Sequence, residues 1–432
     1  MSKYVRKEKS QRKHPVISSS SSIIKAPVNP AAIKGRPEWK GPGFVKKTAK
    51  PPSRPAPSSS VSTAPHVQEN RLPSELQQLL LNIFRTTFPI CQDYEALKPA
   101  LTEIKKALDA RDFEQAFGSL DSMEAYAVRW SPSRALCYAA VLAELCEEYG
   151  EETCIQSLLK RESITADWSS ESSGNVARSA KAVCFGGGAA EIMAFGALLR
   201  YLYPNSDTMT MPSVSVSNST SPLLGSGSSP PSPLLDLHLV NAASWAAVIS
   251  SLQSGLTTPP TLSKYASASA RANNAAFICP YALKTSFQQC DILHADQNGL
   301  GYMIGTKPAL ITLFFALNDF LASNVAKSTA FFLKLSNAAP KDSLLLIIDS
   351  LDATSEIILG KDDQEKEQKS YPMHYLLDMV LTEKQMLAAA DQKPAWEKLL
   401  GDQSRHFRIP EGLKYPIGLE NLKFQVHLFK KL

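Results

Sequence analysis

The sequence predicts an α/β protein in which a mostly parallel sheet carries helices on both faces. Three observations predict this fold class. Residues 186–188 are three glycines between an apolar run and an apolar helical pattern, short apolar runs alternate with helical stretches through residues 181–429, and a separate set of helical patterns occupies residues 72–159. Alternating strands and helices form parallel sheets, because each crossover helix packs back onto the sheet.

The chain is organised around Lys181–Leu199, which reads KAVCFGGGAAEIMAFGALL. The pattern is typical of a buried strand, a tight glycine turn and a helix. Glycine lets the backbone come close to a ligand that a side chain would block, and the N–H groups at the start of the helix then face that ligand. Because many α/β folds share such a turn, this stretch alone predicts only a nucleotide-like ligand.

The charge of the chain is unevenly distributed over its 432 residues. Residues 1–54 contain 14 lysines and arginines but only two acidic residues, a net charge of +12, and the remainder carries −7. We therefore expect residues 1–70 to be a disordered basic Ser/Pro-rich tail, because they cannot bury enough apolar surface to offset the entropy of ordering. Such a tail suits a polyanion or a nuclear import receptor.

Cysteine usage indicates an intracellular protein without a structural metal. None of the seven cysteines is spaced as a zinc clamp, and no secretory signal precedes them. No apolar run approaches the length of about 18–20 residues that spans a bilayer. We expect a soluble chain with reduced thiols, no metal and no membrane partner.

Residues 71–165 are predicted to form a helical domain. Helical stripes are expected near residues 72–84, 97–108 and 113–126, and from 131 through 150 with an extension to 159. Ser131 should cap the fourth helix, since Pro132 suits the first turn. The first stripe places five apolar side chains on one face: Leu76, Leu79, Leu80, Ile83 and Phe84.

Residues 166–432 are predicted to form the sheet domain, after a connector at 166–180. Flexible polar insertions are expected at residues 204–233 and 254–274. The expected strands are 181–185, 234–240, 285–293, 309–317, 343–349 and 424–429. The expected helices after the glycine turn include 245–252, 319–337 and 375–381.

Polar groups at four strand ends are the candidate ligands, because open α/β sheets bind at the carboxyl ends of their strands. Their expected contacts are, in chain order, the cofactor backbone, the ribose hydroxyls, the adenine edge and the transferred group. These candidates are Gly186, Gly187, Gly188, Asn241, Asp291, Asn318 and Asp319. The order of roles fits S-adenosylmethionine better than NAD, because Ala190 and Glu191 stand where the dinucleotide motif has its last glycine.

Four separated segments carry a resemblance to a known family. They resemble the fungal large-subunit (25S) ribosomal RNA methyltransferases that act on uridine N3. The four segments are Cys184–Glu191, Ala125–Tyr138, Ile311–Asp319 and Tyr415–Gln425. The resemblance covers roughly residues 72–432. It implies a Rossmann-like class I methyltransferase fold, S-adenosylmethionine as cofactor, ribosomal RNA or a pre-60S particle as partner, and a nuclear and nucleolar location.

Two positions depart from the wider class I pattern. Cys184 and Phe185 stand where an acidic residue often precedes the first glycine, and Asn241 stands where an acidic ribose ligand is commoner. An amide can still donate and accept one hydrogen bond each. A non-catalytic assembly factor with this fold therefore stays open, as does a methyltransferase of a protein or a small molecule.

Each candidate residue also has a purely structural interpretation. The glycines can form a plain tight turn, and Glu191 can favour the start of its helix, where a carboxylate complements the dipole. Asn241 and Asp291 are common turn residues, and Asp319 can cap a helix. For uridine methylation, Asp319 is the expected general base and Asn318 the residue that orients a uracil carbonyl.

Overall fold

The computed structural model describes residues 66–159, 179–204, 233–351, 356–359, 369–382 and 394–432. All of these described residues belong to one compact unit. Nearly all of the expected tail, most of the connector and the 204–233 insertion lie outside the described residues. So does the expected boundary at residue 165, so the division into 71–165 and 166–432 stays a prediction.

An eight-stranded sheet forms the centre of this unit, in the order β1-β9-β10-β6-β5-β2-β3-β4. All neighbouring strands pair in parallel except β10, which runs antiparallel to both β6 and β9. The strands are β1 His66–Val67, β2 Ala180–Phe185, β3 Leu235–Asn241, β4 Leu283–Gln289, β5 Leu310–Phe314, β6 Leu344–Ser350, β9 Trp396–Phe407 and β10 Leu422–Lys431. A separate hairpin pairs β7 Glu356–Leu359 with β8 Lys369–Pro372.

The central strands are buried on both faces, as near-continuous apolar runs predict for a parallel sheet. In β2, Ala182 and Cys184 contribute to one hydrophobic core, whereas Val183 and Phe185 contribute to the other. Successive side chains of a strand point to opposite faces, so the two cores lie on the two sides of the sheet.

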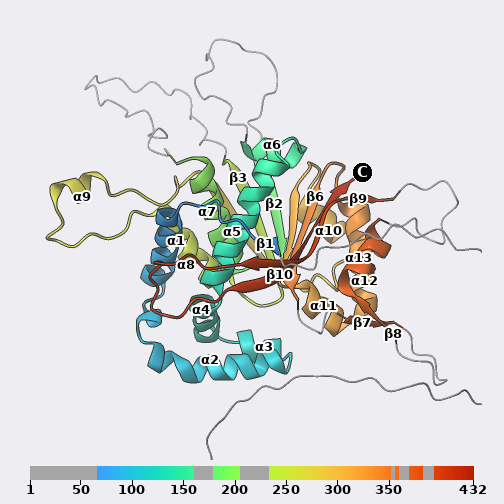
Figure 1. Ribbon diagram of the computed structural model, residues 1–432, viewed down its shortest axis with the longest axis horizontal. Coiled ribbons are helices and arrows are strands. Elements are labelled where there is room, and N and C mark those ends of the chain that lie inside the picture. The colour runs from blue at the N-terminus through green and yellow to red at the C-terminus, as the bar shows by residue number, and fades with distance from the viewer. Residues whose placement is uncertain (1–65, 160–178, 205–232, 352–355, 360–368, 383–393) are drawn as a thin grey trace, which may run out of the picture. The chain divides into compact units, whose positions relative to one another are not determined.

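Two groups of helices cover these faces (Figure 1). The first core includes side chains from α1 Ser74–Thr87, α5 Ser131–Glu148, α7 Ala189–Leu202 and α8 Ala246–Thr257. The second includes side chains from α10 Gln297–Ile304, α11 Leu317–Ser323, α12 Val325–Ala338 and α13 Met373–Leu381. The expected doubly covered parallel sheet is confirmed.

The remaining helices are η1 Pro89–Gln92, α2 Tyr94–Asp109, α3 Phe113–Phe117, α4 Leu120–Arg129, α6 Thr153–Leu159 and α9 Ala268–Ala272. The end of α8 and all of α9 lie within the 254–274 stretch that we expected to be an insertion. Helices α1 to α6, residues 74–159, are called the helical segment below. Of these, α2, α3 and α4 lie together below the sheet in Figure 1.

Two expected helices are each divided in two. The stretch 113–126 breaks after α3, where the Ser119 side chain accepts the Ser122 N–H and starts α4. The stretch 319–337 breaks at Asn324, whose side chain accepts the Lys327 N–H and starts α12. In each case a polar N-cap inside an apolar pattern starts a second helix, because its side chain satisfies an N–H that has no partner within the helix.

Other expected boundaries were also wrong. Helix α5 begins at Ser131 itself, so this residue is the first of the helix and Trp130 precedes it. Leu79 is 47% exposed, although the helical pattern placed it on one apolar face with residues that are buried. Strand β4 ends at Gln289 and β5 at Phe314, so Asp291 lies beyond its strand and Leu317 already belongs to α11. Strand β9 was missed, because the polar middle of its sequence does not alternate as a strand does.

Strand β1 was expected to be part of the disordered tail, and a buried polar network explains why it is ordered. Gln68, which follows β1, is 3% exposed and donates to the carboxylate of Glu144 on α5. Arg405 of β9 donates to Glu144 Oε1 at 2.8 Å and to Gln68 Oε1 at 2.9 Å, and its Nε donates to Asp402 at 2.9 Å. The network therefore joins the edge of the sheet to the helical segment.

Replacing Arg405 by methionine should lower the free energy of unfolding by about 3 kcal/mol, because Glu144 would remain buried without its counter-ion. Urea unfolding measures the change. Lys98→Met is the matched control, since it removes the exposed pair with Glu95, and it should leave the unfolding midpoint unchanged. Equal midpoints for both variants would contradict a stabilising role for the network.

Candidate active site

A pocket of about 540 Å³ opens at the carboxyl ends of β2, β3, β4 and β5. Here the strand order reverses, because β2 lies between β3, the next strand along the chain, and β5; ligands of open α/β sheets bind at such a point. Six of the eight predicted site residues line the pocket, and Gly187 and Asn318 do not. The six are Gly186, Gly188, Glu191, Asn241, Asp291 and Asp319.

The glycine turn is held by its surroundings at two positions. Gly186 has a φ of +80°, which L side chains rarely adopt, and an added Cβ would lie 2.7 Å from the Ala316 Cβ. At Gly187 an added Cβ would lie 2.8 Å from both the Cys184 Cβ and the Leu239 Cδ2. Gly187 therefore serves close packing on the strands, while Gly186 and Gly188 face the pocket.

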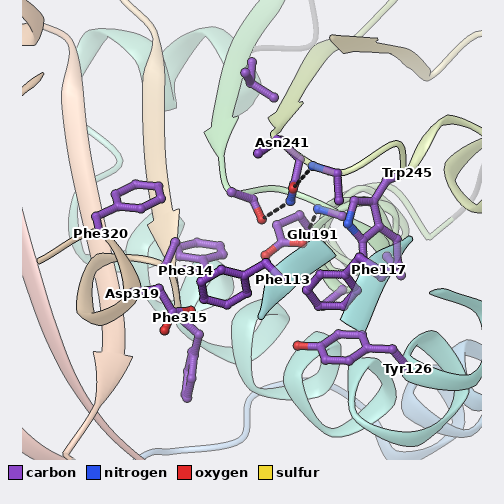
Figure 2. Close-up of a pocket in the computed structure, with 18 of the residues that line it drawn as sticks. Phe113, Phe117, Tyr126, Glu191, Asn241, Trp245, Phe314, Phe315, Asp319 and Phe320 are labelled. Atoms are coloured by element: carbon purple, nitrogen blue, oxygen red, sulfur yellow. Dashed lines mark hydrogen bonds between the residues drawn. The ribbon is translucent and has the colours of Figure 1, made fainter. Parts of the chain in front are cut away.

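Asn241, at the end of β3, holds this turn through its side-chain amide (Figure 2). Its Nδ2 donates to the carbonyls of Gly186 at 3.1 Å and Gly187 at 3.2 Å, and its Oδ1 accepts the Ala243 N–H at 3.0 Å. A carboxylate has no N–H to donate. The departure from the commoner acidic residue thus has a structural reason: this turn needs a donor at position 241.

Glu191 lies in the first turn of α7 and is 5% exposed. Its Oε2 accepts the Gly188 N–H at 2.7 Å, so its side chain completes a cap at the start of the helix. Burial raises the pKa of Glu191 to about 7, although the Gly188 N–H and the positive charge of Arg134 favour its ionised form. The structure therefore places a carboxyl group that titrates near neutrality in the pocket wall.

Arg134 contributes a positive charge to the same pocket from helix α5. It donates a hydrogen bond to the Tyr126 hydroxyl, and its guanidinium carbon lies 5.0 Å from the centre of the Phe315 ring. A guanidinium stays protonated at any physiological pH. The sequence carried a signal for this role, because Arg134 is the single basic residue in the otherwise buried stretch Ser131–Cys146.

Aromatic side chains form the wall opposite the strand ends, as Figure 2 shows. Trp245 lies 5.5 Å from Phe117 and 5.8 Å from Tyr126 between ring centres. Trp245 is buried, and its ring lies against Gly188, where an added Cβ would be 3.4 Å away. Helices α3 and α4 thereby cover the glycine turn.

Asp319 lies in the first turn of α11 with its side chain 47% exposed, and one of its oxygens is 3.6 Å from the Arg111 guanidinium. Burial raises the pKa of Asp319, and the charges of Arg111 and Arg134 oppose that shift. Ala316, not Asp319, occupies the N-cap position of the helix. The side chain is therefore not needed as a cap.

Asn318 turns away from the pocket. Its Nδ2 donates to Asp349 Oδ1 at 2.9 Å and to the Ser350 hydroxyl at 2.9 Å, and its N–H donates to Asp349 Oδ2 at 3.0 Å. Asp349 is buried, and burial raises its pKa to about 7. The sequence analysis did not single out Asp349, because an acidic residue at a strand end has no distinctive spacing.

Asp291 also lines the pocket and lies beyond the end of β4. Its Oδ1 accepts the Leu293 N–H at 3.0 Å and its Oδ2 lies 2.7 Å from His294 Nδ1. The Nε2 of the same imidazole is 2.8 Å from Lys327 Nζ. Asp291 thus shapes a turn in the pocket wall.

The strand order, the glycine turn after β2 and the pocket at the switch in strand order together define a class I S-adenosylmethionine-dependent methyltransferase fold. A family model for SAM-dependent methyltransferases matches residues 84–430. The chain belongs to this family.

One curated relative is the 25S rRNA (uridine(2843)-N(3))-methyltransferase of Saccharomyces cerevisiae, which is 26% identical over 364 residues, 82% of this chain and 85% of the relative. Among solved structures, the chain is similar to a SAM-dependent methyltransferase from Methanosarcina mazei, with 8% identity and a TM-score of 0.26 over 58% of this chain and 92% of that one. It is also similar to human N-acetylserotonin methyltransferase in complex with SAM, with 12% identity and a TM-score of 0.26 over 78% of this chain and 66% of that one.

Within the described residues, no group of three or more His, Cys, Asp or Glu side chains is arranged to hold a metal ion. In the same part of the chain, no helix is both long and apolar enough to cross a membrane.

Replacing Asn241 by aspartate should disrupt the turn, because a carboxylate would face the Gly186 and Gly187 carbonyl oxygens without a proton to share. We expect a loss of about 2 kcal/mol in unfolding free energy and about tenfold weaker S-adenosylmethionine binding by calorimetry. Asn324→Asp is the matched control, since this exposed N-cap uses only its oxygen and aspartate caps as well. Undiminished S-adenosylmethionine binding by Asn241→Asp would show that the Asn241 amide is not needed to hold the glycine turn.

Proposed function

We propose that this methyltransferase transfers a methyl group from S-adenosylmethionine to uridine N3 in large-subunit ribosomal RNA. The observation that carries the proposal is Asp319, a carboxylate with a raised pKa in the wall of the cofactor-sized pocket. Uridine N3 carries a proton near neutral pH, so its methylation needs such a base. The name of the yeast relative, which acts on uridine N3 of 25S rRNA, supports this choice of substrate.

Residues of the glycine turn fit the cofactor. The pocket volume is in the range of small-molecule sites, and Gly186 and Gly188 leave bare backbone at its wall. We assign the methionine end to this turn, where Arg134 and Glu191 offer opposite charges to a carboxylate and an ammonium group. Asn241 would lie beside the ribose while holding the turn, and the turn shaped by Asp291 would lie against the adenine edge.

In the proposed reaction the cofactor supplies the methyl group and the protein supplies the base. When bound, S-adenosylmethionine supplies an electrophilic methyl group. Asp319 accepts the N3 proton, and the charges of Arg111 and Arg134 favour its ionised form. A raised pKa brings the base closer to the operating pH, which makes proton transfer more efficient. The aromatic and apolar walls of the pocket exclude water. They also hold the acceptor nitrogen in line with the methyl group.

Asn318 has a different role here from the one expected for it. A group that orients a uracil carbonyl must donate a hydrogen bond, but the Asn318 Nδ2 already donates to Asp349 and Ser350. We assign it as a positioning residue that fixes the start of α11, and thereby Asp319, against the end of β6.

The basic tail completes the proposal. Its net charge of +12 over residues 1–54 would attract phosphates without regard to sequence, and salt would weaken that attraction. The same charge suits a nuclear import receptor. We therefore propose a nuclear and nucleolar location and a role in ribosome biogenesis on the pre-60S particle.

S-Adenosylmethionine should bind more tightly as the pH rises through about 7. Below this pH Glu191 holds a proton and is neutral, and above it the ionised carboxylate attracts the net positive donor. Because the ionised fraction of Glu191 grows about tenfold between pH 6 and pH 8, the affinity should rise by up to that factor. Calorimetry across this range should show no such rise for Glu191→Gln, while Glu75→Gln, at an exposed position of α1, should behave as wild type.

Asp319→Asn should lower kcat by about 10²–10⁴-fold, as loss of a general base does, with S-adenosylmethionine affinity within about twofold of wild type. Incorporation of a labelled methyl group into ribosomal RNA measures the rate. Asp296→Asn is the matched control, because asparagine still caps α10. Methylation by Asp319→Asn at the wild-type rate would show that another group takes the proton.

The substrate itself is tested by mass spectrometry of ribosomal RNA nucleosides from cells with and without the gene. We expect 3-methyluridine to fall in cells that lack it and to return with the wild-type chain but not with Asp319→Asn. An unchanged 3-methyluridine content in cells that lack the gene would refute the assignment of uridine N3 as the substrate. Methyl transfer without RNA would instead indicate a protein or small-molecule substrate, and failure to bind S-adenosylmethionine a non-catalytic assembly factor.

A further inference from the structure

Phe315 adopts a backbone conformation that a bulky side chain rarely takes. It follows β5 directly and has a φ of +50°. For an aromatic residue this is a genuine outlier, since the left-handed region suits glycine and asparagine. The N–H of Phe315 donates to the Ile348 carbonyl of the neighbouring strand at 2.7 Å, so the sheet holds this conformation in place.

The unusual backbone turns the Phe315 ring into the pocket. Phe314, the preceding residue, is buried with its ring 4.6 Å from that of Tyr138. Phe315 is only half-buried, lines the pocket and carries the Arg134 guanidinium 5.0 Å from its ring centre. Figure 2 shows its ring beside Asp319.

Folding alone does not account for phenylalanine at this position. A residue held in a sparsely populated backbone region costs stability, and such residues cluster at ligand sites. Glycine would meet the backbone demand without strain, and a half-buried ring returns only part of its burial energy. Contacts with Tyr138 and Arg134 offset part of this cost, and a ligand with an apolar face would offset more of it.

We propose that Phe315 is the platform on which the target base stacks after it leaves the RNA, which makes it a substrate-binding residue beside Asp319. The inference rests on the proposed function and deepens it. A base that reacts at a ring nitrogen must come out of its stack, and aromatic rings bind bases by stacking. The Arg134 guanidinium beside the ring adds a cation to this platform.

The test compares Phe315→Gly, Phe315→Trp and wild type as full-length chains on ribosomal RNA. Phe315→Gly should melt no lower than wild type, because glycine relieves the left-handed strain. Its kcat/KM for RNA should fall about 10- to 100-fold, as loss of one stacked base does, with S-adenosylmethionine affinity within about twofold of wild type. Phe315→Trp keeps a stacking face and should retain most of the activity.

Asp342→Gly is the matched control, because Asp342 also has a positive φ, of 63°, but precedes β6 at the end of the sheet away from the pocket. It should gain stability and keep full activity. Wild-type kcat/KM in Phe315→Gly would overturn the platform, and a loss of cofactor affinity that matches its loss of activity would assign the ring to the cofactor instead. Absence of uridine methylation by the wild-type chain would refute the proposed function, a separate outcome.

Discussion

The candidate site depends on the hydrogen bonds by which the side-chain amide of Asn241 holds the glycine turn. Gly186 can take its left-handed conformation, and Gly187 can lie against β2 and β3, only without side chains. Asn241 then joins the end of β3 to both carbonyls of that turn. Because the turn also sets the start of α7, these contacts fix the Gly188 N–H and the capping Glu191 together. The first wall of the pocket is thus built from backbone that is held from a neighbouring strand.

The helical segment completes the charges of the pocket rather than only covering it. Glu191 and Asp319 belong to the helices that follow β2 and β5, whereas Arg134 and Arg111 come from the helical segment. In each case burial raises the pKa of the acidic group, and the charge of a nearby guanidinium opposes that shift. The helices that follow β2 and β5 supply the carboxylates and the helical segment supplies the fixed positive charges, so these charges come together in the pocket only when the two parts are packed against each other.

A polar network at the other edge of the sheet ties the same two parts. Arg405 on β9 and Glu144 on α5 form a buried ion pair that includes Gln68 beside β1. A buried pair of this kind resists separation, because leaving either charge alone in the interior is costly. It thus favours the position of α5, and thereby of Arg134, against the sheet.

Much of this was predictable from local patterns, and the remainder was not, for a physical reason. Apolar runs and the three glycines determined the strands, the parallel sheet and the place of the pocket, because burial on two faces and bare backbone leave direct marks in sequence. Strand β9, the breaks at Ser119 and Asn324, and the approach of Arg134 to the glycine turn depend on partners far away in the chain. Asn241 shows the division most clearly: its position at a strand end was evident, but only the packed structure decided that its amide faces two carbonyl oxygens, where hydrogen-bond donors are required.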